Sequence, residues 1–174
     1  MPRLAVDLHI HTALSPCADD EMTPCNIVNM SVLKGLDAIA VTDHNACDNV
    51  SAVMEAAGER LLVIPGMEVQ TAEEVHLLAY FSTLCCAFSF SDEIKRHLPG
   101  IPNRPEIFGH QWIMDAGDRT VGEREDMLLT STDLSLDEAV KLIREKGGVA
   151  VPAHVDRDSF SVLSQLGFMP RHLP

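Results

Sequence analysis

The sequence predicts an α/β fold organised around a mainly parallel sheet. Short apolar segments typical of buried strands alternate with longer segments that carry helix-capping residues. The 174 residues are 46% hydrophobic, which suits a sizeable core in a single domain. Strand–helix–strand repeats favour parallel pairing, because each helix returns the chain to the same end of the sheet.

Four strands and two helices are expected in the first half. The strands are predicted at residues 4–10, 37–44, 61–69 and 75–81, the last two separated by an acidic turn. The first helix is expected over residues 23–36, because Thr23 suits the N-cap and Pro24 suits the first helical position. The second helix is expected over residues 49–60 and should end near a glycine.

The second half is less regular. A short helix is expected at residues 91–98, followed by a proline-rich stretch at about residues 99–132 with a candidate hairpin at 115–118. Ser135 and Glu138 have the spacing of a capping box at the start of a helix over residues 135–148. A strand at 149–154 and a helix at 158–167 complete the order. We therefore predict one domain, residues 1–174, with an irregular insertion at 99–132.

Composition excludes several functions. The chain has 13 basic and 26 acidic residues, a formal net charge of -13, and no Lys- or Arg-rich run. Capture of long nucleic acid or of an anionic membrane needs clustered positive charge, so nucleic acid is expected only as a nucleotide. The start MPRLAVD lacks the long apolar core of a signal peptide, and no apolar run approaches the ~20 residues that a membrane span needs. We expect a cytoplasmic protein whose five cysteines are reduced.

The first strand carries polar residues at alternate positions, in the segment DLHIHT. Side chains on a strand alternate between faces, so Asp7, His9 and His11 should share one face. Two neighbouring imidazoles suggest a metal ion, although a single histidine at a strand end is more often merely solvated. Ligands from other segments must decide between these interpretations.

Other strands offer such ligands. In parallel α/β folds, functional groups gather at the carboxyl ends of the strands. Five further ionisable residues lie at strand ends or strand starts, namely Asp43, His44, Glu68, His76 and His154. Taken singly, each residue also has an explanation that needs no metal. Asp7 and Asp43 can orient neighbouring histidines, Glu68 can be a strand-end cap, and His76 can be a core histidine. Together they indicate a metal centre of imidazoles and carboxylates, which suits zinc, manganese, iron or nickel.

The segments DLHIHT, TDHN, GMEV, VHLLAYF and PAHVDR, in this order, resemble the PHP (polymerase and histidinol phosphatase) superfamily. The resemblance implies a distorted (β/α)7 barrel with two or three divalent ions, Zn, Mn or Fe, that hydrolyses phosphate esters. It implies that His9 and His11 bind one ion, and that Glu68 bridges to a second ion held by His76 and His154. His44 would serve a third ion, with Asp43 its neighbour in the motif.

The chain departs from that pattern in two places. Where the family often has SDG, with an aspartate for the third ion, this chain has SPCADDE; Cys17, Asp19 or Asp20 can substitute, and we rank Asp19 first. No Asp-x-His pair follows His154, although such a pair normally ends the barrel. We expect a fragment that lacks the last strand, because its absence leaves an unpaired edge. The alternative is an atypical member whose site is completed by a partner chain or water.

The predicted function is a metal-dependent phosphoesterase, a phosphoric ester hydrolase acting on a small phosphorylated metabolite or nucleotide through a metal-bridging hydroxide. Glu68 and His154 are the predicted catalytic residues, together with Arg157, which is placed to hold a phosphate but could equally form a surface ion pair. The alternative is a catalytically incomplete metal-binding or regulatory PHP module.

Overall fold

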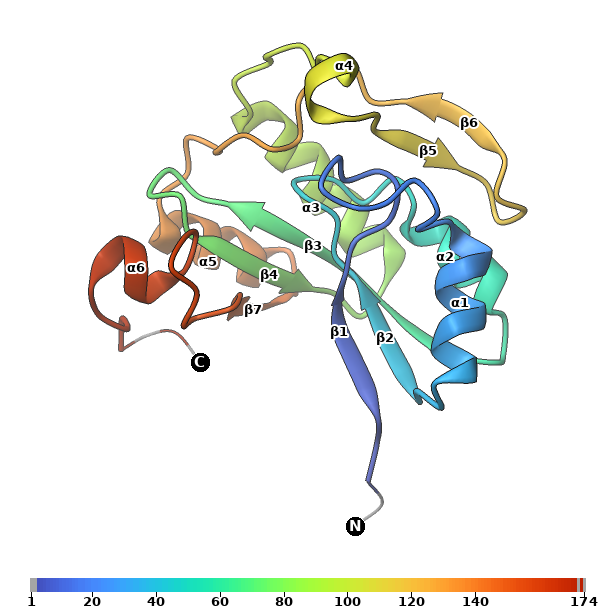
Figure 1. Cartoon of the computed structure of the whole chain (residues 1–174). Coiled ribbons are helices and arrows are strands. Elements are labelled where there is room, and N and C mark those ends of the chain that lie inside the picture. Colours follow the sequence, from blue (N-terminus) through green and yellow to red (C-terminus); the bar gives the residue numbers. More distant parts are fainter. Residues whose placement is uncertain (1–2, 172, 174) are drawn as a thin grey trace.

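A computed structural model describes residues 3–171 and 173 of the chain. Five strands form one sheet in the order β1-β2-β3-β4-β7, and two further strands form a separate sheet, β5-β6 (Figure 1). The strands of the larger sheet are β1 (Val6–Ile10), β2 (Ala38–Val41), β3 (Leu62–Gln70), β4 (His76–Tyr80) and β7 (Val149–Pro152). Those of the smaller sheet are β5 (Trp112–Met114) and β6 (Thr120–Glu123).

The larger sheet is mixed, which corrects the expectation of a mainly parallel one. Strands β1, β2 and β3 are parallel, but β4 pairs antiparallel with both β3 and β7. The reason is the short link at residues 71–75, since a parallel crossover needs about a dozen residues. Because β4 is reversed, β7 runs in the same direction as β1, β2 and β3.

The sheet is curled into a half-barrel. The Tyr80 hydroxyl on β4 donates a 2.8 Å hydrogen bond to the Leu8 carbonyl on β1, across the width of two strands. The rings of His9 and His154, which belong to opposite edges of the sheet, stack with their centroids 5.9 Å apart. The barrel expectation is therefore met in its curvature, but the curled sheet has five strands among the described residues, so a seven-stranded barrel is not confirmed.

Most predicted helices form, with the capping expected from the sequence. The helices are α1 (Pro24–Leu33), α2 (Val50–Ala57), α3 (Leu84–His97), α4 (Pro105–Phe108), α5 (Leu136–Glu145) and α6 (Val162–Leu166). Thr23 caps α1, and Ser135 and Glu138 form the predicted capping box of α5. All five cysteines are free thiols.

Two helix boundaries differ from the prediction. Helix α3 begins seven residues before the expected position, because the Thr83 side chain accepts a hydrogen bond from Cys86 N and caps the helix there. Its buried residues Ala87, Phe90 and Ile94 follow helical spacing, which the run of mixed residues concealed. Helix α6 begins late, after Ser161 provides its N-cap.

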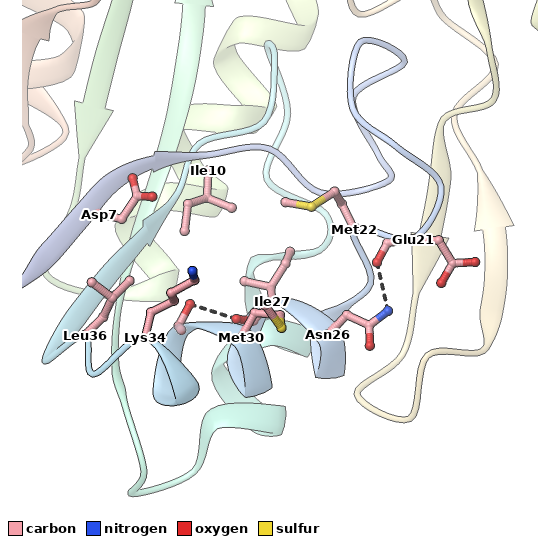
Figure 2. A pocket seen from close by; sticks show the side chains of 10 residues that line it. Asp7, Ile10, Glu21, Met22, Asn26, Ile27, Met30, Lys34 and Leu36 are labelled. Carbon is pink, nitrogen blue, oxygen red and sulfur yellow. Dashed lines mark hydrogen bonds between the residues drawn. The ribbon is translucent and has the colours of Figure 1, made fainter.

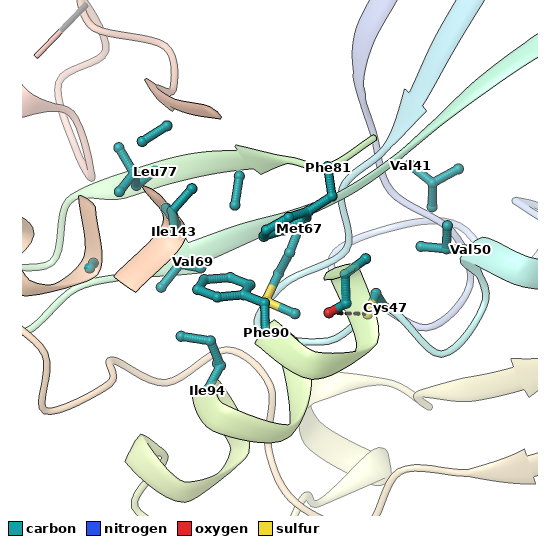
Figure 3. Packing of buried hydrophobic residues seen from close by; sticks show 14 of the residues in the cluster. Val41, Cys47, Val50, Met67, Val69, Leu77, Phe81, Phe90, Ile94 and Ile143 are labelled. Atoms are coloured by element: carbon teal, nitrogen blue, oxygen red, sulfur yellow. Dashed lines mark hydrogen bonds between the residues drawn. The ribbon is translucent and has the colours of Figure 1, made fainter. Parts of the chain in front are cut away.

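The core packs α3 and α5 against one face of the sheet (Figure 3). Phe90 of α3 and Ile143 of α5 are fully buried beside Met67 and Leu77, and full burial of such a side chain contributes about 1.5 to 3 kcal/mol. Because strand residues alternate, Met67 and Leu77 in the core direct Glu68 and His76 to the opposite face. The same alternation that builds the core therefore presents ionisable groups inside the curl.

Residues 99–132 contain the predicted hairpin, with β5 and β6 paired antiparallel. It lies beside the loops that follow β1 and β2 (Figure 1). Two buried asparagines tie this region to the domain: Asn49 bonds both Trp112 O and Met114 N, and Asn45 donates to the carbonyls of Leu128 and Thr130.

Candidate metal centre

The ionisable groups predicted from the sequence meet at one edge of the sheet. Strands β1, β2 and β7 end there, and His9, His44 and His154 lie at or just beyond their carboxyl ends. Strand β4 runs the other way, so its first residue, His76, reaches the same edge. The reversal of β4 explains why this histidine opens its strand while the others end theirs.

One oxygen of Glu68 faces three imidazoles. Glu68 Oε2 lies 3.1 Å from His11 Nε2, 3.2 Å from His9 Nε2 and 3.4 Å from His44 Nδ1. His9 lies on β1 and His11 directly after it, both toward the inside of the curl, and their Nε2 atoms are 3.1 Å apart. This side of the carboxylate is therefore surrounded by nitrogen donors from β1 and the loop after β2.

The other oxygen of Glu68 faces two more imidazoles. Glu68 Oε1 lies 3.0 Å from His76 Nδ1 and 3.3 Å from His154 Nε2. His154 holds its position with a φ of 29°, a left-handed conformation uncommon in residues other than glycine. Glu68, which is 1% exposed, thus separates two sets of imidazoles with its two oxygens.

Electrostatics keep Glu68 ionised. Burial by itself would raise the pKa of this carboxyl group, but hydrogen bonds from His11, His76 and His9 lower the pKa well below its usual range. The pKa of His11 moves the other way: burial lowers it, yet the hydrogen bond to Glu68 and the charge of Asp43 raise it overall. In the metal-free protein, therefore, the charge of Glu68 favours a proton on His11, and a bound cation would replace that proton.

Two other histidines are held neutral. Burial lowers the pKa of His44 to about 3 and also lowers the pKa of His154. Neutral imidazole is the form that binds metal ions. Three buried ring nitrogens have no hydrogen-bond partner among the described residues: His44 Nδ1, His76 Nε2 and His154 Nδ1. Unpaired buried nitrogens cost free energy, and a ligand that accepts their lone pairs would remove that cost.

The donors fit a metal centre. Ligand atoms lie within 4.8 Å of one another in three groups among the described residues, namely His9, His11 and Glu68; His44, Glu68 and His76; and His11, Cys17 and His44. Imidazole nitrogens and a shared carboxylate suit zinc, manganese and iron. His44 belongs to two groups, so it can serve either of two neighbouring ions.

Asp43 lies beside this cluster but points its oxygens elsewhere. It is fully buried and accepts hydrogen bonds from Thr12 N at 2.7 Å, Thr12 Oγ1 at 2.8 Å and Ser15 Oγ at 2.7 Å. Ser15 Oγ in turn accepts from His44 N and contacts His11 Nδ1. In the structure, therefore, both oxygens of Asp43 are turned toward Thr12 and Ser15. Burial raises its pKa despite these donors.

The structure brings Cys17, and not Asp19, to the cluster. Asp19 is exposed, and its side chain accepts a hydrogen bond from Glu21 N. The Cys17 thiol belongs to the group with His11 and His44. Burial and the charge of Glu68 raise the pKa of this thiol to about 11 in the metal-free protein.

A cavity of about 610 Å³ opens on the imidazoles. Its lining consists of ligand-type residues together with Gln70, Glu74, Leu129, Arg157, Ser159 and Phe160. Arg157 is the one cationic side chain in this lining besides the histidines, and no ion pair between it and a carboxylate is found within the described part of the chain. The cavity therefore offers space and a single fixed positive charge next to the cluster.

A second hollow, of about 510 Å³, lies between β1 and α1 (Figure 2). Ile10, Met22, Ile27 and Met30 make it mainly apolar. Asp7 lines this hollow, and its carboxylate accepts a hydrogen bond from the backbone N of His9. The expectation that Asp7 shares the inner face with both histidines is wrong in this respect, because the β1–β2 register shifts between Asp7 and Ile10. No imidazole lines this hollow.

Sequence reasoning missed Thr12 and Ser15, which connect Asp43 to the histidines. Their only signal in the sequence is their place just after the HxH pair, Thr12 directly and Ser15 three residues later; the structure shows that both are buried. It also missed Phe160, whose ring stacks on His76 with centroids 4.7 Å apart. An aromatic residue six positions after His154 carries no local pattern that predicts this contact.

Comparison with known proteins supports a relationship through the whole site. The model of the PHP domain family matches residues 7–156. The 5'-3' exoribonuclease Rnm of Salmonella typhimurium is 36% identical over 73 residues, which are 40% of this chain and 24% of that protein. The chain thus spans about a quarter of this curated relative.

Solved structures share the fold. One, from Bifidobacterium adolescentis, is assigned as a metal-dependent phosphoesterase; it has a TM-score of 0.59 and 20% identity, covering 90% of this chain and 69% of that one. The lesion-specific endonuclease Q of Pyrococcus furiosus has a TM-score of 0.60 and 18% identity, covering 96% of this chain and 40% of that one. An amidohydrolase from Chromobacterium violaceum has a TM-score of 0.57 and 20% identity, covering 87% of this chain and 67% of that one. At these identities the likeness shows the fold alone.

The Salmonella relative is an exoribonuclease and the Pyrococcus protein is an endonuclease. Among the described residues, no helix is long and apolar enough to cross a membrane.

Proposed function

The chain belongs to the PHP domain family, and on that premise we propose that it is a metal-dependent phosphoesterase that hydrolyses a small phosphorylated substrate. The observation that carries the proposal is the position of Glu68, whose two oxygens face separate sets of imidazoles. A carboxylate in this position can bind two cations at once.

The proposed ligand sets follow the two oxygens. His9 and His11 hold one divalent ion with Glu68, and His76 and His154 hold a second ion through the other oxygen. His44 serves a third ion. Bound ions of this kind, Zn, Mn or Fe, neutralise phosphate oxygens and activate water.

The side chains of the protein set the charge of the site and bind the substrate phosphate. Glu68 remains ionised because its pKa is lowered by its histidine donors, so it balances the positive charge of the site. His44 and His154 remain neutral and keep their lone pairs for ligation. Arg157 binds a phosphate oxygen at the cavity wall, where guanidinium groups suit phosphate.

The substrate is proposed to carry one phosphoester group on a compact body. The cavity of about 610 Å³ has the size of a small-molecule site. The net charge of -13 and the single arginine in the lining disfavour a long polyanion. Nucleic acid, on which the named nucleases act, is the second candidate substrate. In that case a segment the size of one nucleotide would occupy the same cavity.

The test combines metal analysis with turnover. Protein purified without chelator should contain at least two transition-metal ions per chain, and the metal-loaded protein should hydrolyse a generic aryl phosphate. Chelation should remove both, and Mn or Zn should restore both. The assay should be repeated with a mononucleotide and a short single-stranded oligonucleotide as alternative substrates.

Metal-loaded protein that hydrolyses no phosphate ester would refute the phosphoesterase and favour a regulatory PHP module. Protein that binds no transition metal, even after reconstitution, would refute both functions.

A further inference from the structure

The loop after β1 carries a thiol into the metal centre. Cys17 is exposed to solvent and lines the same cavity as the histidines. Its sulfur lies within 4.8 Å of ring nitrogens of His11 and His44, which themselves lie within 4.8 Å of each other. The other cysteines lie outside every such group among the described residues.

His44 provides a second and independent indication of a ligand. Its side chain is 7% exposed, and the buried Nδ1 has no hydrogen-bond partner among the described residues. Its backbone N donates to Ser15 Oγ at 3.0 Å, which fixes the backbone of His44 beside the loop that carries Cys17. A buried imidazole with an unpaired nitrogen next to a thiol is the arrangement expected of a ligand pair.

The loop geometry is compatible with this role. Ser15 is held by Asp43, and Ala18 N donates to Ser15 O at 2.8 Å, so the backbone around Cys17 is hydrogen-bonded on both sides. Zn–N bonds of about 2.1 Å and Zn–S bonds of about 2.3 Å place tetrahedral ligands about 3.5 Å apart. Since the ligand atoms now lie within 4.8 Å of one another, the thiol has at most about 1.3 Å to travel, which an exposed side chain covers by rotation.

We infer that Cys17 is a sulfur ligand of a third divalent ion, together with His44, while the neighbouring His11 remains a ligand of the ion that it shares with His9. This inference rests on the proposed metal-dependent function, and it assigns a thiolate where the donors of the two sites at Glu68 are nitrogen and oxygen. Binding releases the thiol proton to solvent and forms one metal–sulfur bond. A thiolate makes the third site softer than the other two, so it should prefer zinc or ferrous iron over manganese.

Asp19 does not compete for this role in the structure. It is two residues further along the loop, exposed, and turned toward Glu21 N. A matched control for the thiol is Cys85, which is also exposed but lies on α3, outside the metal-binding groups.

The experiment uses Co²⁺ as a spectroscopic probe of the intact chain. Chelator-treated wild type, Cys17→Ser, Cys17→Asp and Cys85→Ser are titrated with Co²⁺, and thiolate-to-cobalt charge-transfer absorption in the near ultraviolet is recorded. In parallel, thiol alkylation with and without Zn²⁺ is mapped by mass spectrometry, and bound metal per chain is measured.

Wild type and Cys85→Ser should show the charge-transfer band, and Zn²⁺ should slow alkylation of Cys17. Cys17→Ser should lose the band and bind the third ion at least about tenfold more weakly. Cys17→Asp should retain the ion without the band. These results would support the inference.

A wild-type protein that binds two ions and hydrolyses phosphate esters, but shows no band and no protection of Cys17, would overturn this inference and leave the proposed function intact. A band that persists in Cys17→Ser would overturn it as well. Failure of all four proteins to bind any ion would overturn the inference together with the proposed function.

Discussion

His76 Nδ1 lies 3.0 Å from Glu68 Oε1, although the two residues belong to consecutive antiparallel strands. In the β3–β4 ladder, His76 pairs with Gln70 and Glu68 pairs with Leu78, so their side chains are diagonal neighbours on one face. A short hairpin therefore brings His76 to the carboxylate, whereas longer connections that contain helices bring the other imidazoles.

Glu68→Gln should reduce bound metal and abolish phosphate-ester turnover. The amide keeps the size of the side chain but removes the charge shared between two imidazole sets, so both proposed ions lose a ligand. Because each histidine serves fewer ions, the variant should lose more activity than replacement of His9 or His76 alone. Metal content and steady-state kinetics measure the effect.

Glu55→Gln, an exposed substitution on α2, is the matched control and should behave as wild type. Unchanged rate and metal content in Glu68→Gln would contradict the bridging role of this carboxylate.

Arg157→Ala should mainly raise KM, with a smaller effect on kcat. Arg157 lines the cavity but lies outside the groups of ligand-type atoms, so its loss removes phosphate binding and leaves the metal centre in place. The removal of a charge-assisted hydrogen bond of about 1.5 to 3 kcal/mol predicts a rise of roughly 10- to 100-fold. Arg96→Ala, on the exposed end of α3, should leave KM unchanged. An equal fall in kcat with constant KM would instead indicate a role in the transition state.

Asp43→Asn should destabilise the fold while leaving some metal bound. Asp43 accepts from Thr12 and Ser15 with both oxygens, and an amide can accept with only one. An unpaired buried donor costs about 1 to 3 kcal/mol in the free energy of unfolding, measurable with denaturant. Asp92→Asn, an exposed substitution on α3, is the control. Complete loss of one ion with unchanged stability would make Asp43 a ligand instead.

The stability of the chelated protein should rise with pH between about 3 and 6.5. Burial lowers the pKa of His44 to about 3 in the folded protein, whereas the unfolded value is 6.5. In this range the unfolded chain binds more protons, so unfolding is favoured as pH falls, by up to about 1.4 kcal/mol per pH unit. The lowered pKa of Glu68 acts in the same direction below its usual value of 4.5.

His11, whose pKa is raised, acts in the opposite direction and loses its stabilising effect as pH rises above 6.5. Denaturant unfolding at several pH values measures the slope, and His44→Asn should flatten it. The variant His97→Asn, at a half-buried position on α3, should not. A stability that is constant across this range would contradict the neutral state of His44.

Local patterns were sufficient for most elements. The capping residues Thr23 and Ser135 placed the starts of α1 and α5 correctly, because capping depends on neighbours three residues away. The start of α3 was missed, since its core-facing residues are interspersed with serine and cysteine and lack a clear apolar stripe. The direction of β4 could have been inferred from the short link at residues 71–75, whose length excludes a parallel crossover.

The sequence by itself determined which donors this protein has and at which strand ends they lie: HxH at the first, His44 after the second, Glu68 in the third and His154 after the last. That information is local, because period-two alternation separates core residues from inner-face residues. Only the tertiary structure decided how the donors combine. Glu68 divides five imidazoles between its oxygens, Asp43 turns to Thr12 and Ser15, and Cys17 replaces Asp19 beside His44. These relationships depend on sheet curvature, strand direction and loop hydrogen bonds between residues far apart in the chain, which no local pattern encodes.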